Sequence, residues 1–433
     1  MPVVRPRRLV PTAITWAAGA LVLGLAVGAA GPAAADDWSP PTVLDASGST
    51  SAVLTTDGLV VAGWSSQRGG STKAYASVHE NGGWSSPLPL GGAGTQSRPD
   101  FARNADGSVT AVWTESHPLR GAARVLTSTY ADGDWSVPTE IWQGRDAMSP
   151  RIAANATGDQ VVAWVGGRPA AARTDARRAS GYAVRVMLRP AGGTWGPATR
   201  LDDGTRTVRG AFSVGIDDAG RALVAWAQVQ DGPDQILARR FDGAAWTPEQ
   251  RVGPLGTGAG QVVVAPDGRA AAVSVAHTVR GDRARARLMR ADGTWTGAVV
   301  LDQRAGVVHN ADPSVSLSPD GWTAVFTAGP RTIGVREQVD GRWQPSGRLH
   351  ATHGTASGPR LLVRSGAGDL LAWTEPSADG PSLRTTVRSG NGWTAVDDLG
   401  PSDLGTLVAD SLDGGAVLTW VSHGRTSAAV SGP

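Results

Sequence analysis

Short segments of alternating polar and apolar residues recur along the chain, each followed by a turn and an apolar run. Turns such as Asp57-Gly58 and Asp267-Gly268 supply the positive φ angles that tight hairpins require. The alternating segment Tyr182–Leu188 leads through a second turn, at Gly192–Thr194, into a strand that begins at Trp195. Each repeat of about 50 residues therefore predicts two hairpins, which give four short strands.

Two classes of tryptophan mark the repeats. The first class follows a polar turn and consists of Trp38, Trp84, Trp135, Trp195, Trp246, Trp295, Trp343 and Trp393. The second class ends an apolar run and consists of Trp64, Trp113, Trp164, Trp226, Trp373 and Trp420, with Ser274 and Phe326 in the same place in two repeats. Eight copies of four strands predict an all-β fold, an eight-bladed β-propeller of four-stranded antiparallel blades. We expect the tryptophans to pack between blades rather than to bind a ligand.

The two ends of the repeat region are complementary. Trp38–Leu44 has the character of a fourth strand with no blade ahead of it, whereas Gly405–Val430 offers three strands and lacks a fourth. The N-terminal strand can therefore complete the last blade, which would hide the exposed edges of the sheet.

The first 35 residues have the features of a secretory signal. Arg5, Arg7 and Arg8 precede an apolar run from about Ala13 to Ala30, and Ala33-Ala34-Ala35 offers small residues for cleavage. The pattern predicts a signal peptide over 1–35, a single propeller domain over 36–433, and a secreted, extracellular protein. The alternative is an uncleaved membrane anchor, since the apolar run approaches the length that spans a bilayer.

Charge and cysteine content narrow the function. The signal holds three of the 40 basic residues and no acid, so the mature chain has 37 basic against 38 acidic residues. This near-neutral balance gives no electrostatic footprint for nucleic acid. The chain has no cysteine, which excludes thiol catalysis and thiolate metal sites and leaves stability to burial.

The turn-plus-tryptophan element resembles the Asp-box of sialidase-like β-propellers, a turn between the third and fourth strands of a blade. The Asp-box pattern is Ser-x-Asp-x-Gly-x-Thr-Trp, and the most similar segments here are Ala291–Trp295 and Ala131–Trp135. Both lack the leading serine and have a shorter interval between Asp and Trp. The resemblance implies a propeller for the whole mature chain.

The catalytic residues of that family do not carry over. Sialidases use three arginines, a Tyr nucleophile with a Glu partner, and a Phe/Tyr-Arg-Ile-Pro segment, to which Ser149–Ala153 is the nearest string. Tyr75, Tyr130 and Tyr182 all fall in predicted third strands, where packing explains them. The resemblance therefore implies the architecture without sialidase activity.

Polar residues gather in the predicted connections after the second and fourth strands, which share one face in propellers. The candidate ligand-binding residues are Glu115, His117, Arg151, Arg209, His277, His309, His350, His353, Glu375 and His423. The alternative is that these loops are polar because they contact water. The pair His350 and His353 lacks a defined carboxylate, so we expect neither a metal nor a cofactor.

We expect a monomer that binds a carbohydrate, a cell-surface component or a protein partner on this loop face, and that is not an enzyme. One alternative is an extracellular glycosidase or polysaccharide lyase, which would need two carboxylates about 5–9 Å apart. Its first candidates are Glu115, Asp146, Asp203, Asp312 and Glu375. The other alternative is a purely structural scaffold. Shallow pockets between blades would favour carbohydrate binding, and a carboxylate pair in a funnel would favour an enzyme.

Overall fold

The computed structural model describes residues 37–432 except 46–48, 69, 118–121, 168–181, 205–206, 230–234, 254–256, 279–280, 303–312, 319–320, 330, 353, 365–366, 390–391 and 413. Within these ranges every regular element is a β-strand. The predicted signal peptide, residues 1–35, lies outside the described residues. In the described part of the chain, no helix has the length and hydropathy needed to cross a membrane.

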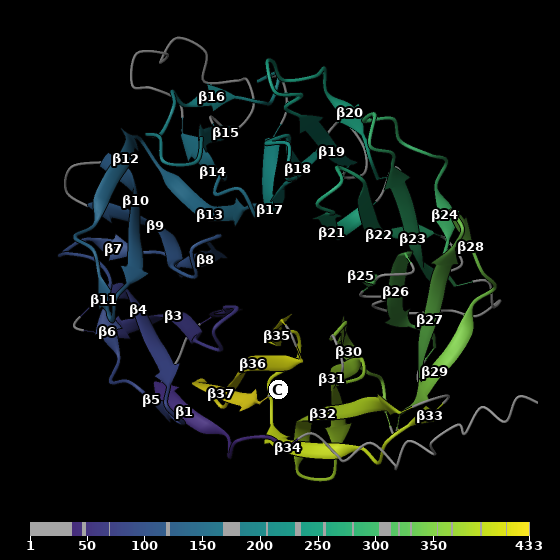
Figure 1. Cartoon of the computed structure of the whole chain (residues 1–433). Helices are drawn as coiled ribbons and strands as arrows, with labels where there is room; N and C mark the ends of the chain where they lie inside the picture. Colours follow the sequence, from purple (N-terminus) through teal and green to yellow (C-terminus); the bar gives the residue numbers. More distant parts are fainter. Residues whose placement is uncertain are drawn as a thin grey trace, which may run out of the picture. The chain divides into compact units, whose positions relative to one another are not determined.

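The described strands form eight antiparallel sheets, numbered here as blades 1 to 8 (Figure 1). Blade 1 contains β2 (Thr50–Leu54), β3 (Val60–Arg68), β4 (Ser71–Glu80), β5 (Gly83–Trp84) and β6 (Leu88–Pro89). Blade 2 contains β7 (Thr95–Gln96), β8 (Asp100–Arg103), β9 (Val109–His117), β10 (Ala122–Ala131), β11 (Asp134–Trp135) and β12 (Thr139–Gly144). Blade 3 contains β13 (Ala147–Ala154), β14 (Gln160–Gly167), β15 (Tyr182–Arg189) and β16 (Thr199–Arg200). Blade 4 contains β17 (Thr207–Ile216), β18 (Ala222–Val229), β19 (Gln235–Arg240) and β20 (Gln250–Arg251).

The second half repeats the plan. Blade 5 contains β21 (Thr257–Val264), β22 (Ala270–Thr278), β23 (Gly281–Met289) and β24 (Val299–Val300). Blade 6 contains β25 (Ser314–Ser318), β26 (Gly321–Thr327), β27 (Thr332–Val339), β28 (Arg342–Trp343) and β29 (Gly347–Ala351). Blade 7 contains β30 (Ser357–Leu362), β31 (Leu370–Ser377), β32 (Gly380–Ser389), β33 (Gly392–Trp393) and β34 (Asp397–Pro401). Blade 8 contains β35 (Val408–Leu412), β36 (Gly415–Ser422), β37 (Arg425–Ser431) and β1 (Thr42–Asp45). Sheets with more than four strands arise where the first or the outer strand is split into two pieces on the same neighbour.

The first strands of the blades form a closed ring (Figure 1). Each touches the next in the order β2, β8, β13, β17, β21, β25, β30 and β35, and β35 returns to β2. The predicted eight-bladed propeller is confirmed.

The N-terminal strand closes the last blade, as the complementary ends predict. β1 pairs with β37 in antiparallel register, and Trp38 bridges Ser431. The Ser39 amide donates to the Val430 carbonyl at 2.8 Å, and the Val430 amide donates to Ser39 Oγ at 3.0 Å. Ser39 and Val430 are 391 positions apart in the sequence, so the two ends of the propeller are neighbours in the structure.

Polar residues fix the turns. At the tip of blade 5, Asp292 Oδ1 accepts hydrogen bonds from the Thr294 amide at 2.8 Å and from Thr294 Oγ1 at 2.7 Å. Gly293 between them has a φ of 88°, a backbone conformation that residues other than glycine rarely adopt. This turn joins the third strand of blade 5 to the Trp295 segment.

Both classes of tryptophan pack between blades. Trp226, which is 1% exposed, and the half-buried Trp246 lie in one cluster with Val184 and Val186 of blade 3. The same arrangement recurs for Trp113 with Trp135, Trp164 with Trp195, Trp373 with Trp393, Trp420 with Trp38, and Trp64 with Trp84. The later blade of the chain supplies both indoles at these seams, except that blade 1 supplies Trp64 and Trp84 at its seam with blade 8.

Blade 6 departs from the sequence pattern. Trp322 belongs to neither predicted class, yet it is 1% exposed and shares a cluster with Phe326 at the seam with blade 5. Two residues of one strand thus fill the volume that a single second-class tryptophan fills elsewhere, and Trp343 completes this seam from the outer strand.

Arginines of the third strands tie neighbouring outer strands together in blades 4, 5 and 6. Arg239 donates to the Thr247 carbonyl of its own blade at 2.6 Å and to the Leu201 carbonyl of blade 3 at 3.0 Å. Arg287 and Arg336 make the equivalent pairs of bonds one and two blades further on. Burial lowers the pKa of Arg287 and Arg336, but a guanidinium stays charged at physiological pH.

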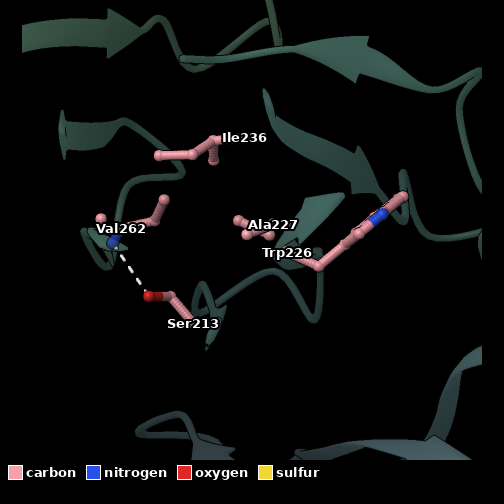
Figure 2. Close-up of a pocket in the computed structure, with 7 residues that line it drawn as sticks. Ser213, Trp226, Ala227, Ile236 and Val262 are labelled. Carbon is pink, nitrogen blue, oxygen red and sulfur yellow. Dashed lines mark hydrogen bonds between the residues drawn. The ribbon is translucent and has the colours of Figure 1, made fainter. Parts of the chain in front are cut away.

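Figure 2 shows the seam between blades 4 and 5. Ser213 Oγ accepts a hydrogen bond from the Val262 amide at 3.1 Å and links the two first strands. The gap beside this bond, next to Ile236, has a volume of about 10 Å³, which is the room of one water molecule at most. The indole of Trp226 extends away from it. This gap is part of the packing and is no ligand site.

Trp226→Ala should lower the free energy of unfolding by about 3–5 kcal/mol, because a fully buried indole leaves a cavity when it is removed. Chemical denaturation measures the loss. Val137→Ala is the matched control, since Val137 is 85% exposed and should change stability by less than about 0.5 kcal/mol. A loss for Trp226→Ala as small as that of the control would contradict the packing role.

A truncated chain that starts at Asp45 lacks the segment that completes blade 8. Its melting temperature should fall by many degrees, because β37 loses its outer partner and becomes an exposed edge. Thermal unfolding followed by circular dichroism measures the shift. An unchanged melting temperature would show that this pairing contributes little to holding the ring together.

Candidate functional site

The residues predicted for the loop face are spread over seven blades, from blade 2 to blade 8. His309 and His353 lie outside the described residues. His117, His277 and Arg209 lie in β9, β22 and β17, but their side chains are not among those described. The structure describes the side chains of the other five candidates, which are Glu115, Arg151, His350, Glu375 and His423.

Glu115 is buried at the end of β9, with 5% exposure. Its carboxylate accepts hydrogen bonds from Gln96 Nε2 at 3.0 Å, from the Gly92 amide at 3.1 Å and from Arg124. Burial by itself would raise the pKa of Glu115, but the bonds from Arg124 and Gln96 outweigh it and hold the pKa below its ordinary value. This carboxylate fixes the connection that leads into blade 2.

Glu375 occupies the equivalent place in blade 7, two residues after Trp373, and is 2% exposed. Trp373 Nε1 donates to one carboxylate oxygen at 3.2 Å, and Arg384 lies 3.5 Å from the other. Arg384 also pairs with Asp398 at 2.7 Å. Both predicted glutamates thus have arginine partners within their own blade.

The other described candidates have separate surroundings. The His350 ring lies 4.8 Å from the Trp373 ring at the seam between blades 6 and 7. His423 sits in the turn between β36 and β37 with a φ of 49°, and its amide donates to Asp403 at 3.3 Å. Arg151 lies on the first strand of blade 3, 3.7 Å from Asp100 of blade 2. Among the described residues, no group of three or more histidines and carboxylates is arranged to hold a metal ion.

A groove with a volume of about 440 Å³ opens at the seam between blades 2 and 3. We call it the Trp195 groove. Its lining consists of Thr127, Ser128, Thr129, Ser136, Thr139, Glu140, Ile141, Met187, Arg189, Gly193, Thr194 and Trp195. Blade 2 contributes its third and outer strands, and blade 3 contributes the end of β15 and the turn that follows.

Trp195 forms the aromatic wall of this groove. It is half-buried and packs at its inner side on the apolar cluster of the seam. The Arg189 guanidinium lies 5.4 Å from the centre of its ring, a distance typical of cation–π contact. Burial lowers the pKa of Arg189, while the nearby charge of Asp106 raises it.

Hydroxyl groups form the opposite wall. Ser128 Oγ donates to the Ser136 carbonyl at 2.6 Å, and the Thr129 amide donates to Ser136 Oγ at 3.0 Å. These bonds hold the Trp135 hairpin against β10. A hydroxyl is both a donor and an acceptor, so this wall can exchange hydrogen bonds with other hydroxyls.

A second hollow, of about 610 Å³, lies between the turns of blades 1 and 2. Its acidic lining residues are Asp57, Glu80, Asp106 and Asp132. At least one of these acids has a structural role in its turn. Asp106 Oδ1 accepts hydrogen bonds from the Ser108 hydroxyl at 2.6 Å and from the Ser108 amide at 3.0 Å. These bonds lower the pKa of Asp106. We assign no ligand to this hollow.

Sequence reasoning did not single out the Trp195 groove. Its walls come from two different repeats, and only the fold brings Thr127–Thr129 beside Trp195. The signal in the sequence is the run of hydroxyl residues Thr127-Ser128-Thr129 on the strand before the turn that leads to Trp135.

No family model and no curated protein matches this chain in sequence. Among solved structures, it is similar to the Penicillium chrysogenum alpha-L-arabinanase complexed with arabinobiose, with 12% identity, 67% of this chain and 94% of that chain covered, and a TM-score of 0.42. It is also similar to a PL25 ulvan lyase bound to a GlcA(1-4)Rha3S ligand, with 11% identity, 71% and 79% coverage, and a TM-score of 0.45. A third is the alpha-L-arabinofuranosidase Arb93A of Fusarium graminearum, with 12% identity, 72% and 96% coverage, and a TM-score of 0.41. Similarities of this size assign neither activity nor substrate to the chain.

Glu115→Gln should reduce stability at neutral pH by about 1–3 kcal/mol, because it removes a buried charge that Arg124 and Gln96 compensate. A lowered folded-state pKa stabilises the fold fully above the unfolded value, about 4.3, and this contribution is lost as the pH falls. The stability gap between wild type and variant should therefore shrink as the pH falls from 7 to about 3. Denaturation series at several pH values measure it. A gap that is independent of pH would contradict a charge-dependent role.

Proposed function

We propose that this protein is an exported, monomeric carbohydrate-binding protein that holds a glycan in the Trp195 groove. The single observation that carries the proposal is a half-buried indole facing a wall of hydroxyl residues across a groove of about 440 Å³. Sugar rings have an apolar face that packs on aromatic rings and hydroxyls that exchange hydrogen bonds. Ligand sites of this size combine aromatic walls with a few polar groups.

The position of the groove supports binding at a seam. We expected the ligand on the connections after the second and fourth strands, whereas the Trp195 groove includes the turn after the third strand of blade 3. Shallow pockets between blades were the feature that would favour a carbohydrate-binding protein. The Trp195 groove is such a pocket, because its two walls belong to blades 2 and 3. The N-terminal 35 residues, with Arg5, Arg7 and Arg8 before an apolar run, support export.

The lining favours binding over hydrolysis. Glu140 is the one carboxylate among the residues that line the groove in the described chain, and it lies 3.5 Å from Arg124. Hydrolysis of a glycosidic bond ordinarily uses two carboxylates that flank the bond. We therefore expect glycans to bind without turnover.

Trp195→Ala should weaken glycan binding about tenfold or more, because the sugar loses its aromatic platform. A glycan array identifies the ligand on the mature wild-type protein, and calorimetry then compares affinities. Trp393→Ala is the matched control, since Trp393 is the equivalent half-buried tryptophan of blade 7 and packs on a different seam.

Both variants should lose similar stability, but only Trp195→Ala should lose affinity. Equal affinities for the two variants would place the ligand elsewhere. An array without any bound glycan would remove the proposal altogether, and release of free sugar from a bound glycan would identify an enzyme instead.

A further inference from the structure

Arg189 is the last residue of β15, the third strand of blade 3, and its side chain contributes to the Trp195 groove. The residue is half-buried and pairs with Gln160 through the strand backbone, but its guanidinium makes no hydrogen bond and no ion pair with any described residue. The guanidinium lies 5.4 Å from the centre of the Trp195 ring, and the charge of Asp106 acts on it from a greater distance. A guanidinium carries five N–H donors in a planar fork, so its hydrogen-bonding capacity is available to whatever occupies the groove.

The same position in blade 7 shows the contrast. Arg388 lies opposite Trp393 in the register of its hairpin, as Arg189 does beside Trp195. Arg388, however, lies 3.4 Å from Glu337 and 3.5 Å from Asp369, so two carboxylates compensate its charge. The repeat therefore tolerates an arginine here in both blades, but only blade 3 leaves the guanidinium without a carboxylate of the described chain within ion-pair distance.

The remaining charges of the groove do not neutralise Arg189. Glu140 lies on the opposite wall and is paired with Arg124 at 3.5 Å. Arg124 itself also binds the buried Glu115. The other lining residues are hydroxyl-bearing, apolar or glycine, so Arg189 is the cation that faces the groove among the lining residues.

We propose that the glycan held in the groove is acidic, and that Arg189 binds its anionic group while the sugar ring packs on Trp195. This inference rests on the proposed function. Arginine pairs with planar carboxylates through two parallel hydrogen bonds and also binds sulfate oxygens, so uronic acids and sulfated sugars share the required chemistry. Stacking on the indole holds the fork in place before the ligand arrives, which reduces the entropy lost on binding.

The test compares three sets of oligosaccharides of matched length, namely neutral, uronate-containing and sulfated, on the wild-type mature protein and on Arg189→Gln and Arg189→Lys. The acidic ligands should bind wild type more tightly than the neutral ones, and their affinity should fall as salt rises. Arg189→Gln should weaken the acidic ligands about tenfold or more and leave the neutral ligands within about twofold.

Arg189→Lys keeps the charge and loses the fork, so it distinguishes the two sources of the anion. A uronate, which uses the paired hydrogen bonds, should lose most of its affinity, whereas a sulfate should keep more of it. Arg388→Gln is the matched control and should change neither affinity. Melting curves of all variants check that the fold is intact, and Arg189→Lys provides the comparison if Arg189→Gln is poorly folded.

The outcomes separate this inference from the proposed function. Equal affinity of wild type for neutral and acidic glycans, or no effect of either Arg189 variant, would overturn the acidic ligand while leaving glycan binding at Trp195 in place. Loss of binding in Trp195→Ala together with selectivity that depends on Arg189 supports both. Acidic glycans that bind equally well to wild type and Trp195→Ala would overturn both.

Discussion

Every blade of this protein depends on a seam with its neighbour. A four-stranded sheet exposes two faces and two edges, and the chain has no disulfide to compensate for poor burial. The faces are covered because each blade presents indoles to the preceding one, as Trp226 and Trp246 do on blade 3. Blade 8 gains its outer strand because β1 returns to β37. Burial between blades, rather than within them, is therefore what gives the chain a single structure.

Seam packing also determines where hollows form. The first strands touch around the whole ring and are linked by bonds such as that between Ser213 and Val262, so the inner part of a seam is closed to all but about one water. Neighbouring blades diverge with distance from the axis, and near their outer strands hydrogen bonds link them in place of direct packing. An example is the bond from Arg239 to the Leu201 carbonyl. A seam without such a tie can open, and the Trp195 groove lies at one of these outer positions.

Much of this fold was predictable because its signals are local. A turn such as that at Asp292 and the tryptophan after it lie within a few residues, and eight copies of the pattern gave blade number and closure. The burial of individual side chains was harder to predict from the sequence. Glu115 and Glu375 were predicted to line a binding face because charged residues at strand ends are ordinarily exposed, but Gln96 and Arg384 come from other strands and enclose them. Their ligand-binding role is still a prediction. The Trp195 groove could not be predicted from the sequence for a related reason, because its walls belong to different repeats.

Repetition makes the differences between blades informative. All copies must keep the residues that fill the seam, so the freedom to change lies in side chains at its outer margin. The residue opposite the hairpin tryptophan is one such place: it is Tyr130 in blade 2, where it packs on Trp135 at 5.4 Å, and Arg388 in blade 7, where two carboxylates hold it. Arg189 shares this place and packs on its tryptophan as Tyr130 does, but no carboxylate of the described chain lies within ion-pair distance of it. A ring of this kind can thus acquire a binding site by altering one margin, because the indole that anchors the seam already supplies the apolar surface on which a ligand can rest.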